Sequence, residues 1–203
     1  MEKLQVINHA LIQNAMSFEQ YFELSQKLVD EGRTTGDNQS ESMIEFTRLN
    51  LSRLKKWIKT GQISSQLEET IAKVNKPVTW LMLVEPWCGD VAQNLAFIYK
   101  AASLNTNIQL KLILRDENLD IMDQYLTNGG RSIPKMVAFD SDLNELAIWG
   151  PRPASVQRML DEGKASGDFD YQVFAISAHS WYAQNKGKEL NDELVDFVKQ
   201  SIK

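Results

Sequence analysis

The 203-residue chain has a single cysteine, Cys88, and only two histidines, His9 and His179. One cysteine excludes an intramolecular disulfide and a zinc site built from several thiolates. Neither histidine has an acidic residue or a cysteine at metal-ligand spacing, so neither is a candidate metal ligand. Any cysteine chemistry is therefore that of one thiol, which can form a mixed disulfide, a sulfenic acid or a link between chains.

The sequence also lacks a long apolar segment and an excess of positive charge. The longest apolar run, Trp80–Val84, is far too short to span a bilayer. The N-terminus has no basic segment followed by an apolar one, as a secretory signal would have. The formal net charge of −5 disfavours a phosphate-binding surface. These features predict a soluble, cytoplasmic protein that binds neither nucleic acid nor membrane, and no motif indicates a cofactor.

The first 75 residues have the pattern of helices. Ser17 and Gln20 form a capping-box pair at the start of an apolar stripe. A second stripe covers residues 44–58, with basic residues in its last turns that complement the helix dipole. A third, short helix is expected over residues 64–74. We predict a helical N-terminal extension over residues 1–75.

The middle of the chain alternates between strands and helices. Four segments have the apolar pattern of strands, and the first is apolar throughout, which indicates burial on both faces. These segments are residues 78–84, 108–114, 135–139 and 145–149. Segments whose apolar residues have helical spacing separate the first three strands. A connection of hairpin length joins the last two strands, and a further helix follows. We predict an α/β domain of order β-α-β-α-β-β-α, with a central mixed sheet, over residues 76–163, and a helical C-terminal extension over residues 164–203.

Two short motifs in this domain resemble those of a known family. Trp87-Cys88-Gly89-Asp90-Val91 lies between the first strand and its helix and resembles the W-C-G-P-C motif of thioredoxins. Arg131-Ser132-Ile133-Pro134-Lys135 resembles their R-G-I-P-T segment, which places a cis-proline beside the active thiol. Gly150 follows the hairpin, where thioredoxins have a glycine beside the substrate groove. The domain is thus identified as thioredoxin-like. The whole chain resembles a bacterial thioredoxin-related family with W-C-G-D and a helical N-terminal extension.

The departures from thioredoxins all affect the resolution of a mixed disulfide. Val91 replaces the second cysteine, Asp90 replaces the motif proline, and Met82 stands where thioredoxins carry a buried acid. A dithiol–disulfide reductase of the intramolecular kind is therefore excluded.

Three functions are compatible with this comparison. The resemblance favours a monothiol protein, a possible thiol–disulfide oxidoreductase in which Cys88 forms mixed disulfides with a protein or a low-molecular-weight thiol. The alternative is a non-enzymatic module that holds an extended peptide in the groove. The monothiol glutaredoxins that bind iron–sulfur clusters have C-G-F-S at the site, of which only the cysteine and the glycine occur here.

The resemblance implies Cys88 and Asp90 as reacting groups and a groove of five residues, Trp87, Gly89, Ile133, Pro134 and Gly150. Unpaired N–H groups at a helix N-terminus favour a thiolate, so we expect an exposed Cys88 with a lowered pKa, opposed by the Asp90 carboxylate. Asp90 has three possible roles: to cap the helix, to relay a proton, or to bond a partner.

Three further expectations concern the surroundings of this site. The resemblance implies a cis peptide bond between Ile133 and Pro134, a geometry found almost only before proline. We interpret Glu85 as a solvated residue at the end of a strand. His179 lies in a segment, His179-Ser180-Trp181-Tyr182, that we interpret as helix packing.

Overall fold

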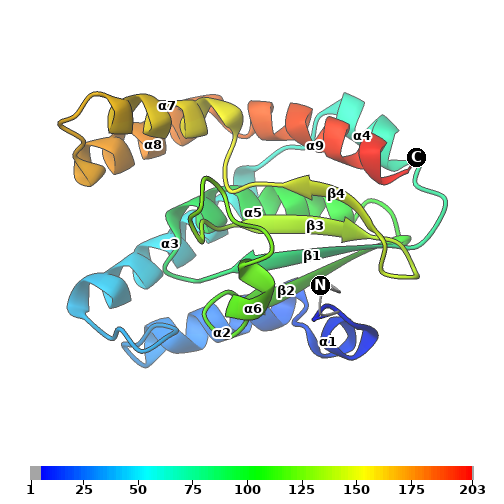
Figure 1. Ribbon diagram of the computed structural model, residues 1–203, viewed down its shortest axis with the longest axis horizontal. Helices are drawn as coiled ribbons and strands as arrows, with labels where there is room; N and C mark the ends of the chain where they lie inside the picture. The colour runs from blue at the N-terminus through cyan, green and yellow to red at the C-terminus, as the bar shows by residue number, and fades with distance from the viewer. Residues whose placement is uncertain (1–5, 203) are drawn as a thin grey trace.

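The computed structural model describes residues 6–202, which fold around a four-stranded mixed sheet (Figure 1). The strands are β1 (Val78–Val84), β2 (Ile108–Leu114), β3 (Lys135–Phe139) and β4 (Glu145–Trp149). β1 pairs in parallel with β2 and antiparallel with β3, and β4 pairs antiparallel with β3, which gives the order β2-β1-β3-β4. The expected α/β fold with a mixed sheet is confirmed.

β1 is a central strand and is buried on both faces. Its residues from Leu81 to Val84 have no exposed surface, because helices and loops cover the sheet on either side. Met82 pairs with Leu112 of β2 and with Met136 of β3. The position of the buried acid of thioredoxins therefore holds a thioether among apolar neighbours, and it has no proton to give to the site.

Three helices complete the order β-α-β-α-β-β-α. They are α5 (Gly89–Ala102), α6 (Leu119–Met122) and α7 (Ala154–Ala165). α6 ends at Met122, whereas the helical spacing of apolar residues in this part of the sequence continues to Leu126. Turns follow Met122, and the Leu126 side chain is exposed.

The helical extensions pack on the sheet and on α5 (Figure 1). They consist of α1 (His9–Asn14), α2 (Phe18–Asp30), α3 (Glu41–Thr60), α4 (Ser65–Ile71), α8 (Tyr171–Asn185) and α9 (Lys188–Ser201). Tyr21 of α2, Leu67 of α4 and Phe197 of α9 are buried in the same apolar core as β1. The extensions therefore contribute to the core of the domain.

α7 and α8 form a helical hairpin, side by side at the upper left of Figure 1. The hairpin has a buried apolar cluster of its own, separate from the main core. Val156 and Leu160 of α7 and Phe174, Ala178 and Tyr182 of α8 form this cluster. The hairpin is thus a small packed unit beside the N-terminus of α5.

The capping box of α2 yields a stability prediction. The Gln20 N–H donates to Ser17 Oγ over 3.3 Å, and the Ser17 N–H donates to Gln20 Oε1 over 2.8 Å. We expect Ser17→Ala to lower the free energy of unfolding by about 1 kcal/mol in urea denaturation. Ser40 starts α3 without a side-chain cap, so Ser40→Ala is the matched control. Equal losses in the two variants would contradict the role of the Ser17 cap.

Candidate functional site

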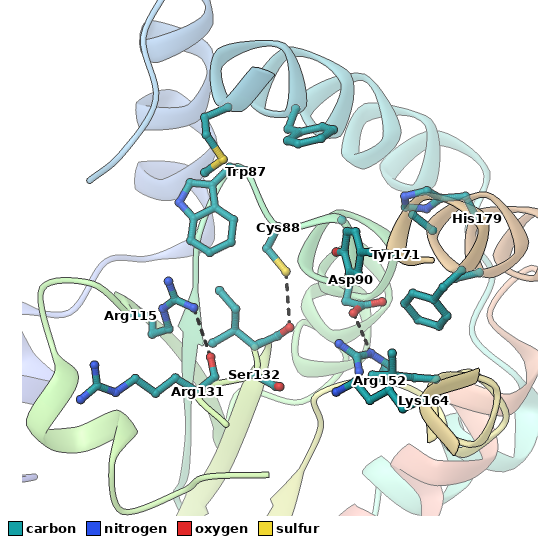
Figure 2. Close-up of a pocket in the computed structure, with 18 of the residues that line it drawn as sticks. Trp87, Cys88, Asp90, Arg115, Arg131, Ser132, Arg152, Lys164, Tyr171 and His179 are labelled. Carbon is teal, nitrogen blue, oxygen red and sulfur yellow. Dashed lines mark hydrogen bonds and ion pairs between the residues drawn. The ribbon is translucent and has the colours of Figure 1, made fainter. Parts of the chain in front are cut away.

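Cys88 lines a cleft of about 490 Å³ between α3 and the α7–α8 hairpin (Figure 2). This volume lies in the range of small-molecule and peptide sites. Met43 and Phe46 of α3 border the cleft on one side, and Tyr171 and Phe174 of α8 border it on another. The cleft therefore combines the thioredoxin-like domain with both helical extensions.

The Cys88 thiol is packed beneath this cleft and is not exposed. Cys88 is the N-cap residue of α5 and is only 8% exposed, and its Sγ donates a hydrogen bond to the Ile133 carbonyl over 3.3 Å. Burial raises the pKa of the thiol to about 12, and the Asp90 carboxylate adds to this rise. The N–H groups of Val91 and Asp90 act in the opposite direction. The expectation of an exposed thiol with a lowered pKa is wrong, because loss of hydration outweighs the helix terminus.

Asp90 joins α5 to the α7–α8 hairpin. Its Oδ1 accepts from the Tyr182 hydroxyl over 2.7 Å, and its Oδ2 accepts from Arg152 Nε over 2.8 Å (the Arg152 bond is dashed in Figure 2). Both side chains of the Asp90–Arg152 ion pair are mostly buried. We call these three residues the Asp90 latch. The carboxylate is engaged in the latch instead of capping α5, and neither oxygen is left without a partner.

Three of the five groove residues line the cleft: Trp87, Gly89 and Ile133. Trp87 lies under the guanidinium of Arg115, with 4.8 Å between the Arg115 Cζ and the ring centroid. Such stacking of an arginine on an aromatic face is favourable and orients both groups. Trp87 therefore forms a wall of the cleft, and its part in substrate binding stays a prediction.

Pro134 and Gly150 lie outside the cleft lining, directly against each other. The Ile133–Pro134 peptide bond is cis, and so is Gly150–Pro151, which sequence analysis did not identify. Gly150 has φ +108°, and a Cβ there would approach the Pro134 carbonyl oxygen to 2.3 Å. Only glycine fits this approach of two backbone segments.

His179 is a site residue that sequence analysis missed. Gln93 accepts from Trp57 Nε1 over 2.6 Å, and its amide nitrogen lies 3.0 Å from His179 Nδ1. Because an indole N–H only donates, the Gln93 oxygen faces Trp57 and its amide donates to Nδ1. The ring proton of a neutral His179 is therefore on Nε2. Burial, together with the charge of Arg53, lowers the pKa of His179 to about 4, so the ring is neutral at pH 7.

One feature of the α8 sequence could have indicated that His179 lines the site. Its apolar residues do not form a single stripe, and Tyr171, Val173 and Ile176 are exposed on the surface. A helix with apolar residues on several faces commonly contacts more than one neighbour. In α8, the face that packs on α7 includes Tyr182, whose hydroxyl reaches Asp90, and His179 lines the cleft.

The interpretation of Glu85 as a solvated residue is wrong. Glu85 has no exposed surface and accepts from the Thr35 hydroxyl and, over 2.9 Å, from the Asp116 N–H. Burial raises the pKa of its carboxyl. The loop before α3, which contains Thr35, covers this end of β1. The covering segment is 50 residues away in sequence, and local pattern could not reveal it.

A sequence profile of the thioredoxin family matches residues 36–164, more than half of the chain. The chain belongs to the thioredoxin family. It is accordingly a thioredoxin-like, redox-related module with one buried cysteine. The profile match begins before β1 and includes α3 and α4 of the N-terminal extension.

Two solved structures share the fold over 91% of this chain and 98% of their own. One is a protein of unknown function from Pseudomonas aeruginosa, with 20% identity and a TM-score of 0.56. The other is an HIV epitope scaffold, with 20% identity and a TM-score of 0.55. At such identity the likeness concerns the fold alone. No curated protein matches the chain.

The described residues, 6–202, hold neither a metal-binding cluster nor a helix that could cross a membrane. No cluster of three or more histidine, cysteine, aspartate or glutamate side chains is placed to hold a metal ion in this part of the chain. No helix within it has the length and apolar character that a membrane crossing requires.

The Asp90 latch predicts a local effect of Tyr182→Phe. Loss of the hydroxyl removes its hydrogen bond to Asp90, so we expect a loss of about 1–2 kcal/mol in the free energy of unfolding. We also expect faster amide hydrogen exchange in α8. Tyr125→Phe is the matched control, because Tyr125 donates its hydroxyl over 3.0 Å to Glu145 at the start of β4, whereas Arg152 of the latch follows the other end of that strand. Identical α8 exchange in the two variants would argue against the latch.

Proposed function

We propose that this protein is a binding module of thioredoxin fold, whose cleft holds an extended acidic segment of a partner protein beside Cys88. The observation that carries the proposal is the state of the thiol. Cys88 is buried, its pKa is raised to about 12, and it donates to the Ile133 carbonyl. A thiol in this state is a packed hydrogen-bond donor, whereas disulfide exchange requires a thiolate.

The backbone of Ile133 supports the extended form of the partner. Ile133 lines the cleft, and among residues 6–202 its N–H makes no hydrogen bond. An extended chain can pair with such a group, as in the addition of a strand to an exposed backbone segment. Trp87 and Tyr171 border the same space and offer ring surfaces for side chains of the partner.

The charges of the cleft support an acidic partner. Four basic residues line it, Arg115, Arg131, Arg152 and Lys164, against the single carboxylate of Asp90. Asp116 and Asp123 pair with Arg115 and Arg131 but do not belong to the lining. With these two carboxylates counted, the cleft keeps an excess of one positive charge, which favours an acidic partner although the whole chain has a net charge of −5.

An array of extended acidic octapeptides tests this function. For peptides that bind, we expect the Ile133 amide signal to shift in ¹⁵N-labelled protein, and affinity to stay within about twofold in Cys88→Ala, because no covalent bond is needed. Lys164→Gln should weaken binding several-fold. Lys188→Gln, at the start of α9 and outside the cleft, should not. Failure of every peptide to shift Ile133, or loss of binding in Cys88→Ala, would contradict the proposal.

The second candidate function is mixed-disulfide formation by Cys88. It is favoured by the position of Cys88 at the N-terminus of α5, where the N–H groups of Asp90 and Val91 and the charge of Arg152 oppose the rise of the thiol pKa caused by burial. In this reaction a Cys88 thiolate attacks one sulfur of a disulfide and releases the other as a thiolate. Since Val91 replaces the resolving cysteine, an external thiol must release the product.

Intact-mass measurement with oxidised glutathione separates the two functions. At pH 7 we expect little glutathione adduct on the wild-type protein, because burial keeps the Cys88 thiol protonated. Cys88→Ser is the control for non-specific addition. A stoichiometric adduct within minutes at pH 7 would favour mixed-disulfide formation over the binding function.

A further inference from the structure

A second hollow adjoins the cleft and lies between α3 and α8. It has a volume of about 570 Å³ and shares six lining residues with the cleft at Cys88: Phe46, Trp87, Gly89, Tyr171, Ala175 and His179. Neither Cys88 nor Ile133 belongs to its lining. Its walls are apolar side chains that are exposed on both helices: Phe46 and Leu49 of α3, and Tyr171 and Ile176 of α8. Exposed apolar residues that face one another across an opening are typical of a ligand-binding groove.

Two nitrogen donors meet at one end of this hollow. Arg53 and His179 both lie against Gly89: a Cβ on Gly89 would be 3.2 Å from His179 Nε2 and 3.9 Å from Arg53 Nη1. His179 presents the N–H of Nε2 there, since Nδ1 accepts from Gln93. Because Gly89 has no side chain, the space between the two nitrogen donors is open. A larger residue at this position would occupy that space.

Arg53 supplies the charge of the hollow. It is the only charged side chain that lines it among the described residues. Its Nη1 donates to Asn50 Oδ1 over 2.8 Å, and no carboxylate of residues 6–202 lies within salt-bridge distance of it. Burial lowers its pKa, which is the direction expected of a cation that lacks a counter-ion.

We propose that the second hollow binds a hydrophobic monocarboxylate. The carboxylate lies between Arg53 and His179, and the hydrocarbon part lies between α3 and α8. One cation without an acidic neighbour balances one negative charge, and the guanidinium matches a planar carboxylate with two parallel N–H groups. This inference goes beyond the proposed partner binding at Cys88, because Arg53, Leu49 and Ile176 line the second hollow and not the cleft.

Decanoate is the probe for calorimetric titration of the full chain at pH 7.5, below its micelle-forming concentration. We expect one decanoate per chain. Decan-1-ol and decyltrimethylammonium have the same hydrocarbon part without the carboxylate, and they should bind at least about tenfold more weakly. Equal affinity for the three compounds would overturn the proposal, and so would the absence of decanoate binding.

Variants on both sides of the hollow locate the binding site. Arg53→Gln removes the charge and should weaken decanoate binding by about tenfold or more. Ile176→Ser should also weaken it, whereas Val173→Ser should not, because Val173 is exposed on α8 but outside the lining. Ile176 and Val173 are 71% and 61% exposed, so neither change disturbs a core. If Arg53→Gln does not fold, the comparison of Ile176→Ser with Val173→Ser tests whether decanoate binds in the second hollow.

Two results keep this inference separate from the function proposed for the cleft. Lys164→Gln, which should weaken octapeptide binding, should retain decanoate binding because Lys164 lies outside the lining of the second hollow, and failure of the octapeptides to bind does not alter that expectation. A peptide with a C-terminal leucine is the competing occupant. If that peptide binds more tightly than decanoate and loses its affinity on amidation, the site takes a protein C-terminus and the small-molecule proposal is overturned. Unchanged decanoate affinity in both Arg53→Gln and Ile176→Ser would also overturn it.

Discussion

The site depends on a single buried carboxylate, that of Asp90. Its two oxygens bind Tyr182 of α8 and Arg152 of the segment before α7, and thereby hold the α7–α8 hairpin beside the N-terminus of α5. When one partner of a buried ion pair is removed, the remaining charge is left without compensation, at a cost of about 3–5 kcal/mol. In this chain the residue that replaces the motif proline of thioredoxins therefore has a structural role of its own.

Cys88 lies in the main apolar core, directly before the residues of α5 that the latch holds. A helix N-terminus stabilises a negative charge by about 0.3–2 kcal/mol, whereas a pKa difference of one unit corresponds to about 1.4 kcal/mol. Burial raises the Cys88 pKa to about 12 in spite of the helix terminus, so loss of hydration is the larger effect. Packing in the main core, with the hydrogen bond to the Ile133 carbonyl, thus keeps the thiol protonated. Both the proposed partner site and the second hollow lie between the α7–α8 hairpin and α3, outside the sheet that defines the family.

Local pattern was sufficient for the sheet and for the family. The β1 segment is apolar throughout, and the β3–β4 pair is joined by a hairpin-length connection, so all four strands have the expected bounds. The capping box of Ser17 fixed the start of α2. By contrast, α1 has only six residues and lacks a long enough apolar stripe to be predicted. The W-C-G segment and the Ile133–Pro134 pair indicated the thioredoxin family, which the profile match shows.

The environment of the site was not accessible to the same reasoning. The sequence predicts Cys88 and Glu85 at the surface, but both are buried and contact segments remote in sequence. The Cys88 thiol donates to the Ile133 carbonyl, and Glu85 accepts from Thr35 of the loop before α3. The tautomer of His179 is fixed by its contact with Gln93, and Trp57 of α3 orients the Gln93 amide. Such contacts depend on how the extensions pack, and single-sequence periodicity records only which residues share a face.

The central claim is that burial in the main core holds the Cys88 thiol protonated at physiological pH. The most direct measurement is titration of thiolate absorbance near 240 nm, with Cys88→Ser subtracted to remove the contribution of the five tyrosines. The account predicts no thiolate below about pH 10, in keeping with a thiol pKa raised to about 12. A transition centred below pH 7 would contradict it and would show that Cys88 is a reactive thiolate in the folded protein.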